Sequence, residues 1–303
     1  MTILLFGKDG QVGWQLQRSL APHGNVIACG RQECDLANLD QLRALIRQVN
    51  PRVIVNASAY TAVDRAERES SLVMRVNAEA PGLMADEASR NGALLLHYST
   101  DYVFDGGKLT PYVETDTAIP LNVYGQSKLA GEQAIASVRC RSLIFRTSWV
   151  FGARGANFVK TILRLAKEKE SVDIVADQIG SPTPAALIAT VSGVVLGVLG
   201  KGRVMAGEEH RIYHLVAANP VSWCQFAQTI VKMASVMPGF NLRLHAEAIH
   251  PVPSLNYPMP ARRPLNSRLA CALIESEFGL QMPDWQPYLG RMLQLLSLKQ
   301  NGY

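Results

Sequence analysis

The sequence contains few cysteines, and none of them stands at a spacing typical of metal binding. The 303 residues include five cysteines, which form no CxxC or CxxH pattern. An odd number without such spacing argues against both a disulfide framework and a zinc site. We therefore expect reduced thiols at all five positions, which are Cys29, Cys34, Cys140, Cys224 and Cys271.

The sequence also has no stretch that combines the length and apolar character of a membrane span. The most apolar uncharged segment, Ala185 to Gly200, is shorter than the roughly 20 residues that a membrane helix needs. The apolar start, Ile3 to Phe6, runs into Gly7 without a preceding basic region, so it predicts a strand and not a signal peptide. We expect a cytoplasmic protein without a membrane partner.

Runs of like charge, internal repeats and low-complexity tracts are absent as well. The formal net charge is +5, but the lysines and arginines are scattered and do not alternate with aromatic residues. This scatter does not predict nucleic-acid binding, and it suits a small anionic ligand. With 48% hydrophobic and 18% charged residues, the chain has an ordinary globular composition and the length for one large core or two domains.

What the sequence does contain is a regular alternation of short apolar strands and amphipathic helices in its first half. This alternation predicts βαβ units and a Rossmann-like, doubly wound parallel sheet. The pattern loosens after Trp149, so we expect a dinucleotide-binding domain at 1–150. A smaller α+β substrate domain is expected at 151–303, with some segments returning to the main sheet. The predicted strands lie at 2–6, 26–28, 53–55, 94–98 and 143–145.

Two helix starts carry the pattern of a capping box, and one helical region contains a proline. Asn38 is followed three residues later by Gln41, and Ser222 by Gln225, which predicts reciprocal capping at both starts. The long helical region that precedes the strand at 94–98 contains Pro81, where we expect an interruption.

Three glycines, Gly7, Gly10 and Gly13, punctuate the first junction between a strand and a helix. Glycines at this spacing permit a tight turn and let backbone N–H groups, including those of Gln11 and Val12, approach a diphosphate at the helix start. The pattern also arises by chance in purely structural turns. Its place near the amino terminus of a βαβ unit favours dinucleotide binding.

The end of the second strand bears on which coenzyme is bound. An acid there usually holds the adenosine ribose of NAD, whereas an arginine accommodates the 2′-phosphate of NADP. This chain has Arg31, and Asp35 with Leu36 could flank the adenine. NADPH is therefore favoured over NADH, although Arg31 could instead simply point to water.

Polar and small residues follow three further strands. Because ligands bind outside the carboxyl ends of strands in open α/β sheets, we expect these residues to share one site. The small side chains of Ala57 and Ala59 would let the backbone lie against a nicotinamide ribose. We expect this contact to continue to Tyr60 and Thr61. Thr100 offers a hydroxyl to a developing alkoxide, unless it merely caps the strand end. The three segments are Asn56 to Thr61, Ser99 to Asp101 and Arg146 to Trp149.

Tyr124 and Lys128 stand four residues apart at a predicted helix start, so they share one helix face. A nearby ammonium can make a tyrosine, whose pKa is normally about 10, a useful proton donor or acceptor. Such a pair is common on protein surfaces, and alone it is weak evidence. Together with Thr100 and the glycine turn it predicts a catalytic set that also contacts the coenzyme.

These motifs together resemble the extended short-chain dehydrogenases/reductases, and within them the dTDP-4-dehydrorhamnose reductases. The resemblance runs from the first strand to about Leu269. The stretches that carry it are Phe6 to Trp14, Asn56 to Asp64, Tyr98 to Gly106, Pro120 to Gly125, Lys128 to Glu132, Arg146 to Val150, Asp177 to Thr183 and Arg263 to Ser267.

The resemblance implies that NADPH or NADH delivers hydride to C4 of dTDP-4-dehydro-β-L-rhamnose. By motif position, Tyr124 would protonate the C4 oxygen and Thr100 would hydrogen bond it. Lys128 would lower the pKa of Tyr124 and bind the nicotinamide ribose. Thr100, Asp101 and Trp149 would contact the sugar, although a tryptophan here could equally belong to the core.

Some relatives are described as binding magnesium through glutamates at a dimer interface. The corresponding regions here contain Gln15, Ala186 and Gln286, so we expect no metal and leave monomer and homodimer open. Arginine pairs bidentately with phosphate oxygens, which makes Arg262 or Arg263 a candidate for the substrate diphosphate.

Three other functions share this sequence pattern. A 4-ketoreductase of opposite C4 stereochemistry would keep Thr100, Tyr124 and Lys128. A non-catalytic regulatory subunit on the same fold would have no need to keep all three. A dehydratase or epimerase is disfavoured because dehydratases of this class usually place an acidic pair after the strand-four threonine, whereas Asp101 is followed here by Tyr102.

Overall fold

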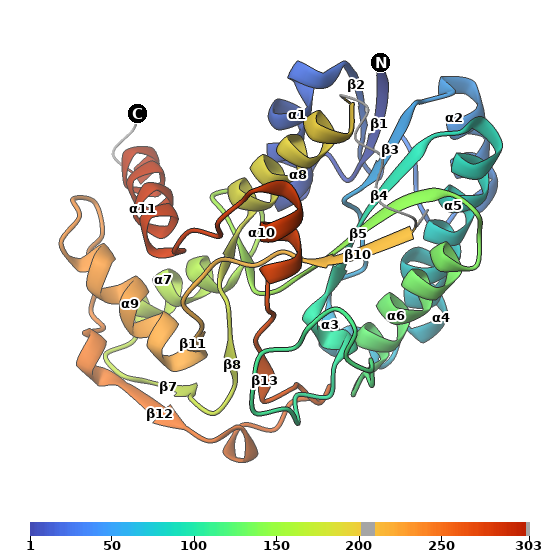
Figure 1. The fold of residues 1–303 in the computed structure, drawn as a ribbon. Coiled ribbons are helices and arrows are strands. Elements are labelled where there is room, and N and C mark those ends of the chain that lie inside the picture. The colour runs from blue at the N-terminus through green and yellow to red at the C-terminus, as the bar shows by residue number, and fades with distance from the viewer. Residues whose placement is uncertain (201–209, 301–303) are drawn as a thin grey trace.

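The structure, a computed structural model, describes residues 1–200 and 210–300. Its main sheet has six strands, all parallel, and its order is β10-β5-β4-β3-β1-β2 (Figure 1). The doubly wound Rossmann-like class predicted from the sequence is confirmed. The strands are β1 (Thr2–Phe6), β2 (Asn25–Cys29), β3 (Val53–Asn56), β4 (Leu94–Thr100), β5 (Arg141–Thr147) and β10 (His210–His214).

The direction of strand addition reverses next to β1. From β1 the chain first adds β2 on one side and then places β3, β4 and β5 in turn on the other side. In open α/β sheets such a reversal leaves a crevice outside the carboxyl ends of the strands, because the connections on either side run to opposite faces. The fold therefore provides a ligand crevice between the segments that follow β1 and β3.

Helices cover both faces of the main sheet (Figure 1). Successive side chains of a strand point to opposite faces. In β1, Ile3 and Leu5 pack into the core under α1 and α8, whereas Leu4 and Phe6 pack into the core under α2 and α5. The covering helices are α1 (Gln11–Leu20) and α8 (Ala185–Gly200) on one face, and α2 (Leu39–Val49), α5 (Ala80–Asn91) and α6 (Val123–Ala136) on the other.

The helical region before β4 is interrupted where proline was expected to disturb it. Short helices α3 (Val63–Ala66) and α4 (Ser70–Met74) lead into a π-helical turn, η2 (Arg75–Glu79), directly before α5. Pro81 has no backbone N–H, so it cannot complete the regular bond to the carbonyl of Asn77. That carbonyl instead lies against α6, at Gly131.

The remaining elements form a smaller α+β region beside the carboxyl ends of the main strands. Three small sheets have the orders β11-β8-β13, β12-β7 and β6-β9. Their strands are β6 (Val150–Phe151), β7 (Val172–Val175), β8 (Ile179–Gly180), β9 (Thr183–Pro184), β11 (Val221–Ser222), β12 (Ile249–Val252) and β13 (Asn266–Ser267). The helices are α7 (Phe158–Glu168), α9 (Trp223–Ser235), α10 (Ala272–Phe278) and α11 (Gln286–Gln300), with short 3₁₀ turns η1 (Ala21–His23), η3 (Asp101–Val103), η4 (Ala246–Ala248) and η5 (Ser254–Asn256).

Two segments beyond residue 150 belong to the main sheet layers. β10 pairs with β5 as the edge strand, and α8 packs against α1. The apolar α8 is a core helix, and within residues 1–200 and 210–300 no helix is long and apolar enough to cross a membrane.

The two expected capping boxes differ in the structure. At α9 the Ser222 hydroxyl and the Gln225 side chain cap reciprocally, as predicted. At α2 the Asn38 side chain accepts from the Gln41 N–H at 3.0 Å, but the Gln41 side chain bonds Asp35 N and Glu33 O. The second half of that prediction is wrong, because the preceding loop uses the glutamine for its own backbone groups.

Candidate active site

The glycine turn after β1 brings the backbone at Gly7 close to the first turn of α1, at Gly13. Gly7 adopts a left-handed φ of 87°, and a Cβ on Gly13 would lie 2.0 Å from the Gly7 carbonyl oxygen. Gly10 is the residue before the helix, and no side-chain cap hydrogen bond is made to the N–H groups at the start of α1. This geometry fits the diphosphate of a dinucleotide, whose charge the helix start attracts.

A cavity of about 290 Å³ opens in the crevice beside this turn, between the segments that follow β1, β2 and β3. Its walls include eight of the residues predicted to bind the coenzyme, and six that were not predicted. The predicted residues are Gly7, Gly10, Arg31, Asp35, Leu36, Ala57, Ala59 and Tyr60. The others are Asp9, Gly30, Cys34, Ser58, Leu72 and Val76.

Other predicted coenzyme residues lie outside these walls. Gln11 donates to Val150 O at 3.3 Å and accepts from Asn157 Nδ2 at 2.8 Å, so its side chain ties the glycine turn to the smaller region. Val12 packs against the core, Gly13 lies beneath Gly7, and Thr61 is exposed.

The mouth of the cavity after β2 carries charges of both signs. The Arg31 side chain is 79% exposed and lies 3.5 Å from Asp35 Oδ2. Glu33 accepts from the Gly30 N–H at 2.8 Å and pairs with Lys8, and these bonds lower the pKa of its carboxyl. Arg31 therefore stands free enough to turn toward an anion.

Thr100 ends β4 and begins η3. Its hydroxyl donates to Asp101 Oδ1 at 3.0 Å and accepts from the Tyr102 N–H at 3.2 Å. The Tyr124 phenol, in the first turn of α6, lies next to Thr100, whose hydroxyl lowers the phenol pKa, whereas burial has the larger effect and raises that pKa to about 12. Asn122 caps that helix by accepting from the Gly125 N–H at 2.8 Å, which fixes where Tyr124 emerges. The structure thus brings two of the three predicted catalytic residues into contact.

Lys128 lies one turn further along α6 and is buried against β4. Its Nζ donates to Tyr98 O at 2.7 Å and lies 3.1 Å from His97 Nε2. Burial lowers the pKa of Lys128 to about 8, opposed by the charge of Glu132. The lysine side chain thus contacts β4, the strand that ends at Thr100, through His97 and Tyr98.

The two predicted sugar contacts lie on either side of the carboxyl edge of β4 and β5. Asp101 is 2% exposed, its Oδ2 has no hydrogen-bond partner among the described residues, and burial raises its pKa to about 6. Trp149 has a left-handed φ of 45°, a strained conformation of the kind that clusters at active sites. Its ring stacks on Trp223 at 3.5 Å, and its edge lies over Gly180.

The arginines suggested for a diphosphate differ in their surroundings. Arg263 forms a bidentate ion pair with Asp64, at 3.1 and 2.8 Å, and also hydrogen bonds Tyr102. Arg262 is exposed. Through this ion pair, Arg263 connects the segment before β13 to α3.

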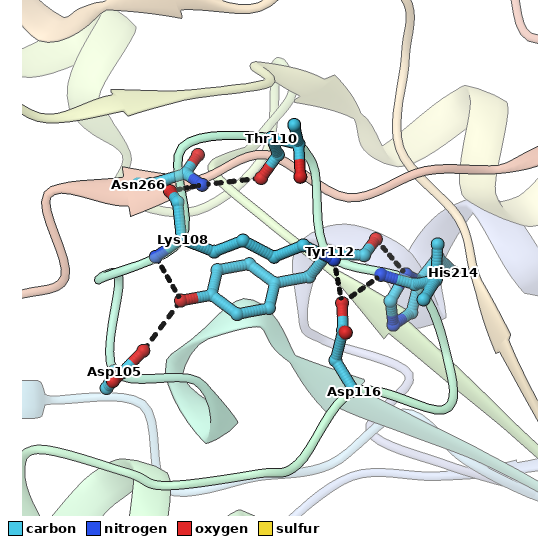
Figure 2. Close-up of polar contacts among 8 residues, drawn as sticks. Asp105, Lys108, Thr110, Tyr112, Asp116, His214 and Asn266 are labelled. Carbon is cyan, nitrogen blue, oxygen red and sulfur yellow. Dashed lines mark hydrogen bonds and ion pairs between the residues drawn. The ribbon is translucent and has the colours of Figure 1, made fainter.

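The loop that follows η3 is held by residues distant in sequence, as Figure 2 shows. Asn266 of β13 donates to Lys108 O at 2.6 Å and to Thr110 O at 2.9 Å, while the Tyr112 hydroxyl donates to Asp105 at 2.6 Å. Ser267, the next residue of β13, hydrogen bonds Asp101. The smaller region thus closes onto the site through β13.

Sequence reasoning did not single out His97, which contacts Lys128, or Asn56, which contacts His97. His97 lies inside a run of buried apolar residues of β4, and Asn56 was noted only as the end of a strand. The available signal was their polarity, since a buried polar side chain needs a hydrogen-bond partner.

A parallel sheet with a glycine turn, a crevice at its topological switch point and a Thr–Tyr pair at the strand ends define a Rossmann-type dehydrogenase/reductase. The chain matches the family model described as RmlD substrate binding domain over residues 1–298. It belongs to that family, the dTDP-4-dehydrorhamnose reductases.

Similar proteins cover almost the whole chain. A dTDP-4-dehydrorhamnose reductase from Burkholderia thailandensis is 46% identical over 290 residues, which are 96% of this chain and 97% of that protein. One from Shigella flexneri is 45% identical over 98% of each chain. The crystal structure of the Bacillus anthracis dTDP-4-dehydrorhamnose reductase in complex with NADP is 33% identical, with a TM-score of 0.86 over 97% of this chain and 99% of that one.

Proposed function

We propose that this protein reduces the C4 ketone of dTDP-4-dehydro-β-L-rhamnose to give dTDP-L-rhamnose, using NADPH or NADH. The observation that carries the proposal is that Tyr124 lies next to Thr100 at the strand ends, on the same edge of the sheet as the proposed coenzyme crevice. The full-length likeness to proteins named for this reaction supports the substrate.

The coenzyme, when bound in the crevice, supplies a hydride to the ketone carbon. Tyr124 gives its phenolic proton to the C4 oxygen, because a ketone oxygen seated here replaces Thr100 as its acceptor. Thr100 holds that oxygen in line, and a charged Lys128 favours the phenolate that remains on Tyr124. Removing water from the pocket strengthens each of these interactions.

The coenzyme diphosphate binds at the glycine turn, and Arg31 favours NADPH by turning its exposed guanidinium to the 2′-phosphate. The nicotinamide half of the coenzyme contacts the segment after β3, at Ala57, Ala59, Tyr60 and Thr61. NADH remains a competent donor, because the contacts at the turn do not involve that phosphate. The NADP bound in the Bacillus anthracis protein agrees with this preference.

The sugar lies over the carboxyl ends of β4 and β5, between Asp101 and Trp149. Residues 1–150 form the coenzyme domain, and residues 151–303 supply mainly the substrate side, apart from α8 and β10. We expect the reaction at this site to involve no metal, because Gln15, Ala186 and Gln286 offer no carboxylate ligand. We place the enzyme in the cytoplasm, as a monomer or homodimer.

The test is the loss of reduced-nicotinamide absorbance with dTDP-4-dehydrorhamnose, followed by NMR of the product. Consumption of NADPH and a product with rhamnose configuration at C4 are expected. A talose product would identify the opposite reductase, and no consumption with either coenzyme would refute the proposal.

Tyr124→Phe should lower kcat by at least about 100-fold, since it removes the proton donor, while the Kd for NADPH changes little. Tyr102→Phe is the matched control, because Tyr102 lies edge-on to Tyr124 with ring centres 5.6 Å apart. It should reduce turnover far less. Equal losses in both variants would show that Tyr124 is not the specific donor.

A further inference from the structure

Two buried polar side chains lie side by side on the sheet face that α6 covers, next to Lys128. Asn56 of β3 and His97 of β4 are register partners. Each is 1% exposed, and their Nδ2 and Nδ1 atoms are 3.1 Å apart. Neighbouring positions on this face are apolar, Ile54 and Leu95 among them. Burying such a pair costs free energy unless every polar atom is satisfied.

The hydrogen-bond directions within this pair follow from one backbone contact. The Ser58 N–H can only donate, and it lies 3.1 Å from an Asn56 side-chain atom, which is therefore the oxygen. The other atom of that amide is the NH₂ group, so His97 Nδ1 accepts from it. Burial is the larger cause that holds the pKa of His97 well below its usual value, and a charged Lys128 lowers it further, so the ring is neutral beside either form of the lysine. Its single proton is then on Nε2.

This tautomer brings two donors face to face. His97 Nε2–H points at Lys128 Nζ, 3.1 Å away. A charged ammonium has three N–H bonds and no lone pair, whereas an uncharged amine can accept the imidazole proton and still donate to Tyr98 O. The contact therefore favours the uncharged form of Lys128.

The other charged groups around Lys128 do not reverse this preference. Glu132 lies one turn further along α6, but its carboxylate is paired with Arg146 of β5 at 2.6 Å and both are buried. Tyr124 lies one turn before Lys128 on the same helix, and its raised pKa keeps it uncharged near neutral pH. His97 is thus the group in hydrogen-bond contact that discriminates between the two forms of the lysine.

We propose that His97, oriented by Asn56, is a positioning residue that holds Lys128 against β4 and makes its charged form less favourable than it would be in water. The proposal rests on the proposed function in one respect, namely that charged Lys128 assists Tyr124. The charged form still predominates near neutral pH, so turnover should fall as pH rises above about 8 and that form disappears.

The direct test is an NMR titration of the full chain labelled with ¹³C at lysine Cε, with Lys128→Met identifying the resonance. Wild-type Lys128 should titrate near pH 8. In His97→Gln a carbonyl oxygen can replace Nε2–H and accept from the ammonium, so the midpoint should rise by about one pH unit. The falling limb of kcat with pH should move by the same amount.

His97→Asn is the matched comparison, because a shorter amide can keep the contact with Asn56 but does not reach Lys128. Its titration midpoint should rise less than that of His97→Gln. Equal midpoints in the three proteins, or a wild-type midpoint near the ordinary 10.5, would overturn the proposal even if a variant proves unstable. A wild-type protein that does not reduce the ketosugar would refute the proposed function instead, and the titration would still decide the role of His97.

Discussion

Asp101 is a buried carboxyl group at the carboxyl edge of β4, beside the proposed proton donor. Thr100 and Ser267 hydrogen bond it, but Oδ2 has no partner among the described residues. Burial disfavours the charged form, which raises the pKa of Asp101 from 3.8 to about 6. Near neutral pH the folded protein therefore carries a costly charge at the proposed sugar site, a pattern common where function opposes stability.

Asp101→Asn should make the protein more stable at pH 7.5, by up to about 3 kcal/mol, which is the free energy that corresponds to the pKa shift. Because the folded pKa lies above the unfolded one, the folded state binds more protons between about pH 4 and 6. The stabilising contribution of protonated Asp101 is complete below pH 3.8 and is lost as pH rises through 6.

Urea unfolding at pH 7.5 and at pH 4.5 measures this difference. The gain from Asp101→Asn should shrink at the lower pH, where wild-type Asp101 is largely protonated. Asp86→Asn, on the exposed side of α5, is the matched control and should change stability little at either pH. A gain that is the same at both pH values would show that charge burial is not its cause.

The crossing of α6 over the π-helical turn η2 sets the position of Tyr124 and Lys128 together. A Cβ on Gly131 would lie 2.1 Å from Asn77 O, so the two backbones touch there. Asn77 also donates to Ser127 Oγ and exchanges hydrogen bonds with the backbone of Tyr60 at the coenzyme cavity. One crossing therefore fixes the catalytic helix and the coenzyme loop relative to each other.

Gly131→Ala should lower the free energy of unfolding by about 1–3 kcal/mol, because the added methyl group must push α6 away from η2. Turnover should fall as well, since Tyr124 moves with the helix. Gly200→Ala, at the end of α8 with open space around it, is the control and should be neutral or slightly stabilising. Thermal melting and steady-state kinetics on both variants test this, and an unchanged melting temperature in Gly131→Ala would contradict the close contact.

The two halves of the chain meet around the site, and β13 is one of their main connections. Asn266 satisfies two carbonyl groups of the loop that follows η3 (Figure 2), and Ser267, the next residue of β13, interacts with Asp101. Residues more than 150 positions apart thus hold the loop that borders the proposed sugar site.

Asn266→Ala should destabilise the protein by about 1–3 kcal/mol, since it leaves two carbonyl groups without their donor. It should also raise KM for the ketosugar more than it lowers kcat, because the loop is no longer held while Thr100 and Tyr124 stay in place. Asn256→Ala, on the exposed turn η5, is the control. If Asn266→Ala and Asn256→Ala have the same KM for the ketosugar, the loop does not contribute to substrate binding.

The sequence by itself determined the local features of this protein. The strand runs, the glycine turn, the Ser222 cap and the i,i+4 spacing of Tyr124 and Lys128 depend on backbone geometry within a few residues. A glycine at position 7 and the continuous apolar run in β1 therefore indicated the first strand and turn of the Rossmann-like sheet. The residue types of Thr100, Tyr124 and Lys128 likewise indicated the chemistry that we propose.

Only the tertiary structure decided what those residues contact. The pairing of Asn56 with His97, the direction of the Lys128 side chain and the burial of Asp101 arise from parallel register and helix packing between segments 30 or more residues apart. Sequence spacing carries no information about such contacts, because the chain between them is free to take many paths until the sheet forms. The protonation states at the site therefore follow from the fold, even though the residues that carry the protons could be read from the sequence.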